Sequence, residues 1–226
     1  MAETTPIDTA RTKAVVRRLL DDAAPVRRLR PPLMRLGLWL IVVAIVGAAV
    51  GASGVRPDLE IRLRDPFYVL EIGALGVAGL LMAARAFQEA VPGYAARWPS
   101  RGVGLGLVLV AAMLWLRQPV NGELALAEFI TTGIACSART LALAALPWCA
   151  LLIAIRRGAP LAPVRAGALA GGGAFLTAAF LMRIDCRLDE PLHLLVWHAL
   201  PVAAGVGLSA VIGLVWLRRW RSRPPR

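Results

Sequence analysis

The sequence lacks the short motifs that mark most enzyme classes. Its three cysteines include no Cys-x-x-Cys pair, which excludes the usual kind of thiol–disulfide oxidoreductase. There is no phosphate-binding loop, no metalloprotease motif and no Ser, His and Asp set typical of hydrolases. Gly102, Gly104 and Gly106 lie in an apolar stretch, so they do not form a nucleotide-binding loop. The sequence therefore predicts a protein that is not an enzyme and that carries no permanent cofactor.

Lysine is nearly absent, since Lys13 is the only one, and arginine supplies the remaining positive charge. Together with the heavy use of alanine, leucine and glycine, this indicates a GC-rich bacterial genome. The net charge of +12 would suit a nucleic-acid-binding protein, but the arginines stand in short clusters between apolar runs. We therefore interpret the charge as a membrane-orientation signal and expect no direct contact with nucleic acid.

Apolar residues make up 58% of the chain, and the mean hydropathy is +0.65, whereas soluble domains are usually about 45–50% apolar. Spanning a bilayer takes about 20 helical residues, and six apolar runs approach or reach this length. They cover residues 37–52, 67–87, 102–116, 140–155, 166–182 and 194–217. The runs are apolar on all sides, which favours lipid-embedded helices over barrel strands. We predict an all-α polytopic membrane protein with six transmembrane helices and no cleaved signal peptide.

The arginines predict the orientation of these helices, because basic residues concentrate on the cytoplasmic side of a membrane. Most of the 26 basic residues fall in the N-terminal tail, the second and fourth loops and the C-terminus, whereas those of the other loops stand among acidic residues. We expect both termini in the cytoplasm of a bacterial cell and the protein in its inner membrane. Three regions follow: a cytoplasmic tail over residues 1–36, a six-helix domain over 37–217 and a basic tail over 218–226.

The N-terminal tail contains a candidate amphipathic helix that begins near Asp8 or Thr9 and ends before Pro25. Its apolar residues recur at helical spacing on one face, namely Val15, Val16, Leu19 and Leu20. A single small helix cannot bury such a stripe by itself. Two partners satisfy it equally well on physical grounds, the surface of the lipid bilayer and a groove on another protein. The remaining alternative is a disordered tail that only sets the topology.

Several pieces of the chain together resemble one family. The stretch from Leu19 to Pro32 reads Leu-Leu-Asp-Asp-Ala-Ala-Pro-Val-Arg-Arg-Leu-Arg-Pro-Pro. In order, there follow Val91-Pro92-Gly93, Cys136 just before the fourth helix, Pro147 within it, Arg156-Arg157-Gly158-Ala159-Pro160, Cys186 with Asp189-Glu190, and Trp197 in the last helix. This order is similar to that of the NrsF-type family, the negative regulators of sigma factor F. One departure is His198, where that family commonly has an aromatic residue such as Tyr.

The resemblance implies a six-span anti-sigma factor that holds an extracytoplasmic-function (ECF) sigma factor at the membrane through its tail and releases it under stress. We expect Val15, Val16, Leu19 and Leu20 to form the contact stripe. Asp21 and Asp22 would lie at its rim, where charges steer association. The alternative is a small membrane transporter or channel, although the sequence shows no internal repeat and only one clear charge, Glu71, inside an apolar run. Its position about one turn from the outer end favours a carboxylate that reaches water. The oligomeric state is left open.

The cysteines are the candidate sensor. Cys136 and Cys186 both fall at the outer face in the predicted topology, where a disulfide is geometrically plausible; two unrelated cysteines are the alternative. The resemblance implies that paired outer cysteines sense stress, by oxidation, reduction or transient capture of a soft metal ion. His193 would add a nitrogen ligand, and His198 is a lesser candidate. Cys149 lies thirteen residues after Cys136 in the same predicted helix, so we expect it to be a small buried apolar residue.

Small residues also stand four apart on three of the expected helices. These are Gly47 and Gly51, Gly102 and Gly106, and Gly167 and Gly171. Such pairs allow two helices to approach closely. We expect them to pack within one bundle rather than to form a dimer interface.

Overall fold

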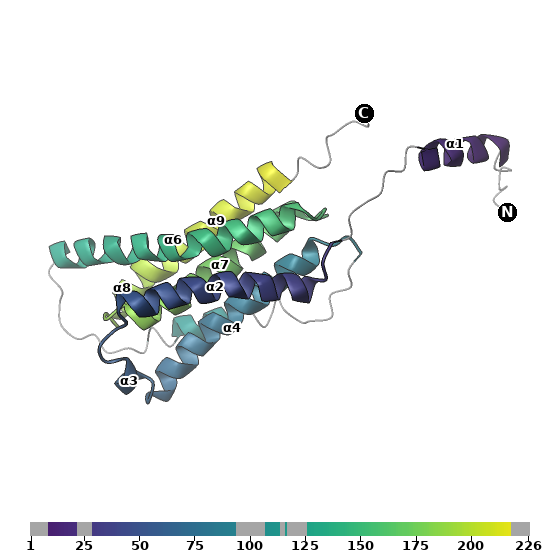
Figure 1. The fold of residues 1–226 in the computed structure, drawn as a ribbon. Coiled ribbons are helices and arrows are strands. Elements are labelled where there is room, and N and C mark those ends of the chain that lie inside the picture. The colour runs from purple at the N-terminus through teal and green to yellow at the C-terminus, as the bar shows by residue number, and fades with distance from the viewer. Residues whose placement is uncertain (1–8, 22–28, 94–106, 114–115, 117–125, 218–226) are drawn as a thin grey trace, which may run out of the picture.

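The computed structural model describes residues 9–21, 29–93, 107–113, 116 and 126–217, and within them it contains helices and no strand (Figure 1). The elements are α1 (Thr9–Asp21), α2 (Pro32–Ser53), α3 (Leu59–Arg62), α4 (Pro66–Glu89), α6 (Leu126–Arg156), α7 (Pro163–Asp185), α8 (Pro191–His193), the π-helical turn η1 (Leu194–Ala199), α9 (Leu200–Ile212) and the π-helical turn η2 (Gly213–Leu217). The predicted all-α class is confirmed for these residues.

Among the described residues, five helical stretches are long and apolar enough to cross a membrane: α2, α4, α6, α7 and the continuous run Pro191–Leu217. Their outward faces carry large exposed apolar side chains, for example Leu38, Ile41 and Ile45 on α2. Such faces suit lipid rather than water. Of the predicted span 102–116, residues 107–113 and 116 are described, and these are helical.

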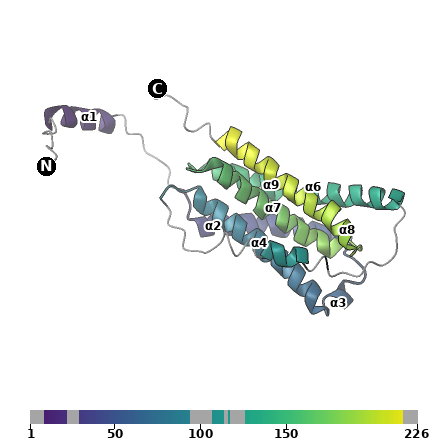
Figure 2. The ribbon, with the colours of Figure 1, turned by 180° about the vertical axis from the view of Figure 1, so that it is seen from behind.

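The fourth span is much longer than the apolar pattern predicts. α6 has 31 residues, whereas the sequence predicts a span over 140–155. Polar residues near the start of α6 interrupt the apolar pattern, so the pattern does not predict a helix there. These polar groups are satisfied within the helix, since the Thr131 hydroxyl donates to the Ala127 carbonyl at 2.9 Å. At ~1.5 Å per residue α6 is roughly 46 Å long, and its first turns extend beyond α2 (Figures 1 and 2).

This longer helix corrects two expectations about cysteines. Cys136 does not precede the helix but lies inside α6 and is buried. Cys149 is in the same helix, as expected, but its side chain is exposed, so the prediction of a buried Cys149 is wrong. Cys149 belongs to the outward, lipid-suited side of α6, where a small apolar thiol is compatible with hydrocarbon.

Helix α7 forms the centre of the bundle and packs against α4, α6 and α9 (Figures 1 and 2). Small residues permit this packing: a Cβ added at Gly167 would lie 2.3 Å from the Ser209 carbonyl oxygen, and one at Gly171 would lie 2.6 Å from the Ser209 Cβ. Ser209 then links three helices, because its hydroxyl donates to the Gly167 carbonyl at 2.6 Å and accepts from Trp148 Nε1 at 2.9 Å. The expected packing within one bundle is confirmed for Gly167 and Gly171.

The other two glycine pairs differ from this one. A Cβ added at Gly47 would meet Leu181 at an ordinary distance of 3.5 Å, and one at Gly51 would meet nothing within 4 Å. Gly102 and Gly106 lie outside the described residues. Close helix packing therefore depends on α7 rather than on α2.

The first span begins earlier in the structure than the apolar pattern predicts. α2 begins at Pro32, five residues before the predicted start at residue 37, and Arg35 in its first turn is buried. The guanidinium of Arg35 donates to the Ala154 carbonyl of α6 and lies 5.0 Å from the centre of the Phe87 ring of α4. These contacts bring the start of α2 to the ends of α4 and α6, so α2 runs antiparallel to both helices.

We expect Gly167→Ala to lower the free energy of unfolding by ~1–3 kcal/mol, because its Cβ would be forced against the backbone of α9. Gly207→Ala is the matched control, since an added Cβ there meets nothing within 4 Å, and it should leave stability unchanged or slightly raised. Denaturant titration of both variants in detergent micelles measures the difference. Equal stability of the two variants would contradict the packing described here.

Candidate functional site

Four side chains from separate elements meet at one end of the bundle. Cys136 comes from α6, Cys186 follows α7 directly, His193 ends α8 and His198 lies in η1; all four are buried. The Sγ atoms of Cys136 and Cys186 are 3.7 Å apart, and Nε2 of His193 is 3.7 Å from the Cys186 Sγ. One donor atom of each residue lies within 4.8 Å of those of the others. Both cysteines are free thiols, and the structure brings Cys136, Cys186, His193 and His198 together.

The turn after α7 returns the chain to the cluster. α7 ends at Asp185, Cys186 is extended at its C-cap with its N–H donating to the Met182 carbonyl at 2.7 Å, and residues 186–190 are not helical. Pro191 then starts α8 at the first helical position, where a proline loses no helix hydrogen bond. The next turn therefore begins beside the end of α7, and His193 lies within reach of Cys186.

A π-helical turn brings His198 to the same side as His193. Pro201 has no N–H for the Trp197 carbonyl four residues earlier, and the Ser137 hydroxyl of α6 donates to that oxygen at 3.0 Å. The Leu200 N–H instead bonds the Leu195 carbonyl, five residues back. In an α-helix residues five apart point about 140° away from one another, whereas a π turn closes over five residues. The rings of His193 and His198 accordingly have centroids 5.3 Å apart.

Aromatic rings from the start of α6 and from η1 pack beside the cluster. Phe129 has its ring centroid 5.6 Å from that of Trp197 and 6.4 Å from that of His193. Gly133 makes this contact possible, because a Cβ there would lie 2.1 Å from the Trp197 ring. The apolar pattern does not predict these aromatic contacts, because it starts the fourth span after Cys136.

The thiols of Cys136 and Cys186 also differ in pKa. The pKa of the Cys186 thiol lies well below its ordinary value, because the Cys136 thiol donates a hydrogen bond that stabilises the Cys186 thiolate, and His193 and His198 add to this effect against the cost of burial. A thiolate is the nucleophilic and metal-binding form of cysteine. Cys186 is thus the more acidic thiol of the pair.

A buried ion cluster adjoins the cysteines. Arg183 of α7 and Glu71 of α4 are both 0% exposed and form an ion pair. Arg183 also contacts Asp189 at 2.9 Å, and the Tyr68 hydroxyl donates to the Arg183 carbonyl at 2.7 Å. The expectation that Glu71 reaches water is wrong: α4 turns this carboxylate inward, where Arg183, a residue that the sequence assigns to a loop, neutralises it.

Asp189 joins this pair to the segment after α2. It accepts from Arg56 at 2.8 Å and forms a second ion pair with Arg62, and both arginines also bond Asp58. Burial alone would raise the pKa of Asp189, but hydrogen bonds and charge from Arg56 and Arg183 outweigh it, so its pKa lies below the ordinary value. The hydrogen bond from Arg56 likewise holds the pKa of Asp58 well below its usual range. Three carboxylates therefore balance three arginines around residues 186–190.

The predicted contact stripe on the tail lies far along the chain from the cysteines, on α1. Val15, Val16, Leu19 and Leu20 are all exposed, with Leu19 at 66% and Leu20 at 69%. Asp21, the last residue of α1, is exposed too, whereas Asp22 lies outside the described residues. Both views show α1 outside the bundle (Figures 1 and 2), so the structure forms the predicted apolar face and leaves it uncovered.

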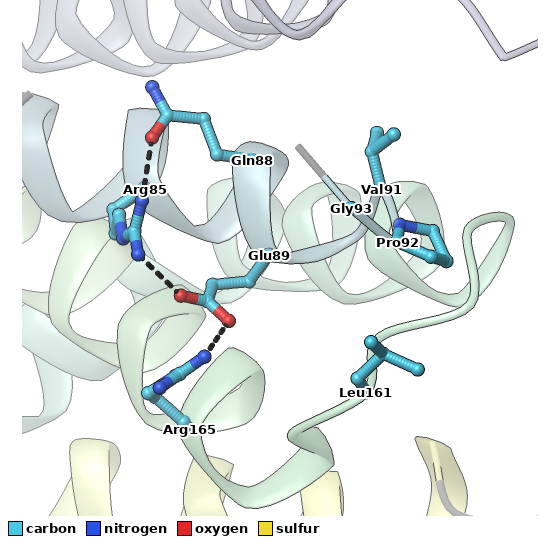
Figure 3. A pocket seen from close by; sticks show the side chains of 8 residues that line it. All are labelled: Arg85, Gln88, Glu89, Val91, Pro92, Gly93, Leu161 and Arg165. Atoms are coloured by element: carbon cyan, nitrogen blue, oxygen red, sulfur yellow. Dashed lines mark hydrogen bonds and ion pairs between the residues drawn. The ribbon is translucent and has the colours of Figure 1, made fainter. Parts of the chain in front are cut away.

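A pocket of about 200 Å³ lies at the other end of the bundle from the cysteines, between α4 and the start of α7 (Figure 3). Arg85 donates to Gln88 at 3.0 Å and pairs with Glu89 at 2.9 Å, and Arg165 pairs with the same Glu89. Because Glu89 holds both arginines, we interpret this polar group as a tie between α4 and α7.

We expect Asp189→Asn to lower the free energy of unfolding by ~3–5 kcal/mol, since it removes one partner of a buried ion cluster and leaves arginine charge uncompensated. Glu60→Gln is the control: it breaks the exposed Glu60–Arg64 pair, which should contribute at most ~1 kcal/mol. Denaturant unfolding in micelles measures both. Similar losses in the two variants would show that the buried cluster does not hold this end together.

Comparison with known proteins assigns the chain to a family. It matches no curated protein and no solved structure. The family described as negative regulator of sigma F, NrsF, matches residues 19–220, a stretch that includes the end of α1, the ion cluster and all four members of the cysteine–histidine cluster. The chain therefore belongs to the NrsF family of negative regulators of sigma factor F, and its partner is a sigma factor.

Proposed function

We propose that this protein holds an ECF sigma factor at the bacterial inner membrane through residues 1–36 and releases it when a periplasmic redox or metal signal reaches Cys136 and Cys186. The observation that carries the proposal is the uncovered apolar face of α1 in a chain whose family regulates a sigma factor. The alternative of a small transporter or channel gains no support, since the embedded Glu71 and Arg183 neutralise each other.

The tail has the chemistry of a docking helix. Its 13 residues present four exposed aliphatic side chains on one side, with Asp21 and the arginines around them. A groove on a sigma factor would bury this stripe, as grooves do for other amphipathic helices. The bilayer surface is the competing partner for the free tail. A sigma factor bound at this position cannot join RNA polymerase.

The proposed topology places the tail and the cysteines on opposite sides of the membrane. The arginine distribution favours a cytoplasmic position for residues 1–36 and 218–226, and α2 runs antiparallel to α4 and α6. Cys136 and Cys186 then lie at the periplasmic end of the bundle. The signal must therefore cross the membrane through the helices of residues 37–217.

The cysteines can change the spacing of two helices. Their Sγ atoms are 3.7 Å apart, whereas a disulfide requires ~2.05 Å. An oxidant that accepts two electrons and two protons would therefore pull α6 towards the end of α7. Capture of a soft metal ion would instead hold both sulfurs at a distance, so the two signals produce distinct geometries.

A chain of contacts connects this change with the helix that leads to the tail. Asp189, three residues after Cys186, holds Arg56 and Arg62 just beyond α2, and the Arg56 N–H donates to the Ile184 carbonyl at 3.1 Å. At its other end α2 continues into the tail. Movement of residues 186–189 would thus act on α2 and change how α1 is presented.

We expect Leu19→Asp combined with Leu20→Asp to abolish capture of the cognate sigma factor by the full-length protein in micelles, because two charges would enter an apolar contact. Ala14→Asp is the control: it adds one carboxylate to the opposite side of α1 and should retain capture. Pulldown with a folded ECF sigma factor measures both. Undiminished capture by the double variant, or a topology reporter that places Met1 outside the cell, would refute the tail assignment.

We expect Cys136→Ala and Cys186→Ala each to remove the stress-induced rise in sigma-dependent transcription, because either change destroys the pair. Cys149→Ala should keep the wild-type response, since Cys149 is exposed and far along α6 from the cluster. A promoter reporter in living cells, read with and without oxidant or metal, measures the response. A normal response in the cells that lack both cysteines would exclude them as the sensor.

A further inference from the structure

We infer that Cys136, Cys186, His193 and His198 form a closed, four-ligand site for one divalent cation of the zinc class. This inference deepens the proposed sensory role of the cysteines, on which it rests, by naming the full ligand set and the kind of ion. The donors are two sulfurs and two nitrogens, which is the composition of many structural zinc sites.

The spacing of the donors fits a tetrahedral ion. Two sulfurs bound at ~2.3 Å with a tetrahedral angle between them lie ~3.8 Å apart. The observed Sγ–Sγ distance is 3.7 Å, and the distance from the Cys186 Sγ to the His193 Nε2 is also 3.7 Å. With all four donors within 4.8 Å of one another, one ion can reach every member with small side-chain adjustments.

The histidines lack the partners that buried imidazoles usually have. His193 and His198 are both 0% exposed. Neither ring nitrogen of His198 has a hydrogen-bond partner, nor has Nδ1 of His193. Burying an imidazole without a partner is costly. A cation between the four residues would bind one nitrogen of each ring and would remove part of this cost.

Charge balance selects a divalent ion. Two thiolates and one divalent cation sum to zero, which suits a buried position, whereas a monovalent soft ion would leave a net negative charge. The neighbouring cluster of Arg56, Arg62 and Arg183 is already balanced by its own carboxylates. The sulfur and imidazole donors exclude hard ions such as magnesium and calcium.

His198 is the residue that closes the site. The resemblance leads us to expect an aromatic residue at this position, which would leave three donors and an open face. Here the π turn caused by Pro201 directs an imidazole to that face. The bound ion would then fasten α6, the end of α7 and the start of the last span to one another.

Metal titration of the full-length protein tests this inference. The protein is purified in micelles, reduced and stripped of metal, then titrated with zinc against a chromophoric chelator and with cobalt as a spectroscopic probe. We expect one ion per chain, intense cobalt d–d bands of tetrahedral geometry and sulfur-to-cobalt charge transfer. Cys136→Ser and Cys186→Ser should weaken zinc binding at least ~100-fold, and His193→Phe and His198→Phe at least ~10-fold. Cys149→Ser is the control and should bind zinc as the wild type does.

Alkylation supplies a readout that needs no variant. In the wild-type protein, zinc should protect Cys136 and Cys186 from a thiol reagent and leave the labelling of Cys149 unchanged, as peptide mass spectrometry would show. Reaction of both thiols at the same rate with and without zinc would overturn the site. So would unaltered zinc affinity in the two histidine variants, or an octahedral cobalt spectrum.

The outcome separates the site from the proposed function. If zinc binds as described but sigma-dependent transcription ignores the two cysteines, the site stands and the sensor role falls. If release depends on the cysteines but no ion binds, the sensor is a thiol pair alone and the four-ligand site is wrong.

Discussion

The arrangement of this protein at its cysteine-bearing end depends on one largely enclosed carboxylate, Asp189, and on its ion pairs with three arginines. Asp189 contacts Arg56, Arg62 and Arg183, and Arg183 in turn holds Glu71 of α4. A buried ion cluster of this kind adds little net stability over apolar packing, but it is costly to break and it fixes one geometry. That geometry determines where residues 186–190 run, and hence where Cys186 lies and where the next helix begins.

The cysteine–histidine cluster follows from this fixed segment and from two local backbone features. Pro191 restarts the helix beside the end of α7, and Pro201 produces the π turn that aligns His198 with His193. α6 can approach because Gly133 leaves room for the Trp197 ring, and Ser137 satisfies the carbonyl that Pro201 leaves without a donor. Several individually unremarkable residues thus place four metal- and redox-active groups together at one end of a membrane bundle.

Helix α1, by contrast, lies outside the bundle (Figures 1 and 2). The apolar side chains of α2, α4 and α6 that face outward can be covered by lipid, but the stripe of α1 is left uncovered. The family assignment identifies the partner as a sigma factor. Between the two elements, α2 has contacts at both ends, with Arg56 just beyond it on the cysteine side and Arg35 buried near its start. Helix α2 is therefore tied to the bundle at both ends.

The sequence by itself determined the features that depend on interactions within one segment of the chain. Long apolar runs must be helical in lipid because every backbone group has to be satisfied within the segment, so the all-helical class and most spans could be predicted. The spacing of Val15, Val16, Leu19 and Leu20 likewise defined the face of α1. Only the tertiary structure decided the pairing of Glu71 with Arg183, the exposure of Cys149, the early start of α6 and the entry of His198 into the cluster. The pairing of Glu71, the exposure of Cys149 and the position of His198 depend on which side of each helix faces its neighbours and on a π turn, and the apolar pattern does not specify such rotations. Helix α6 starts earlier than predicted because polar residues in its first turns interrupt the apolar run.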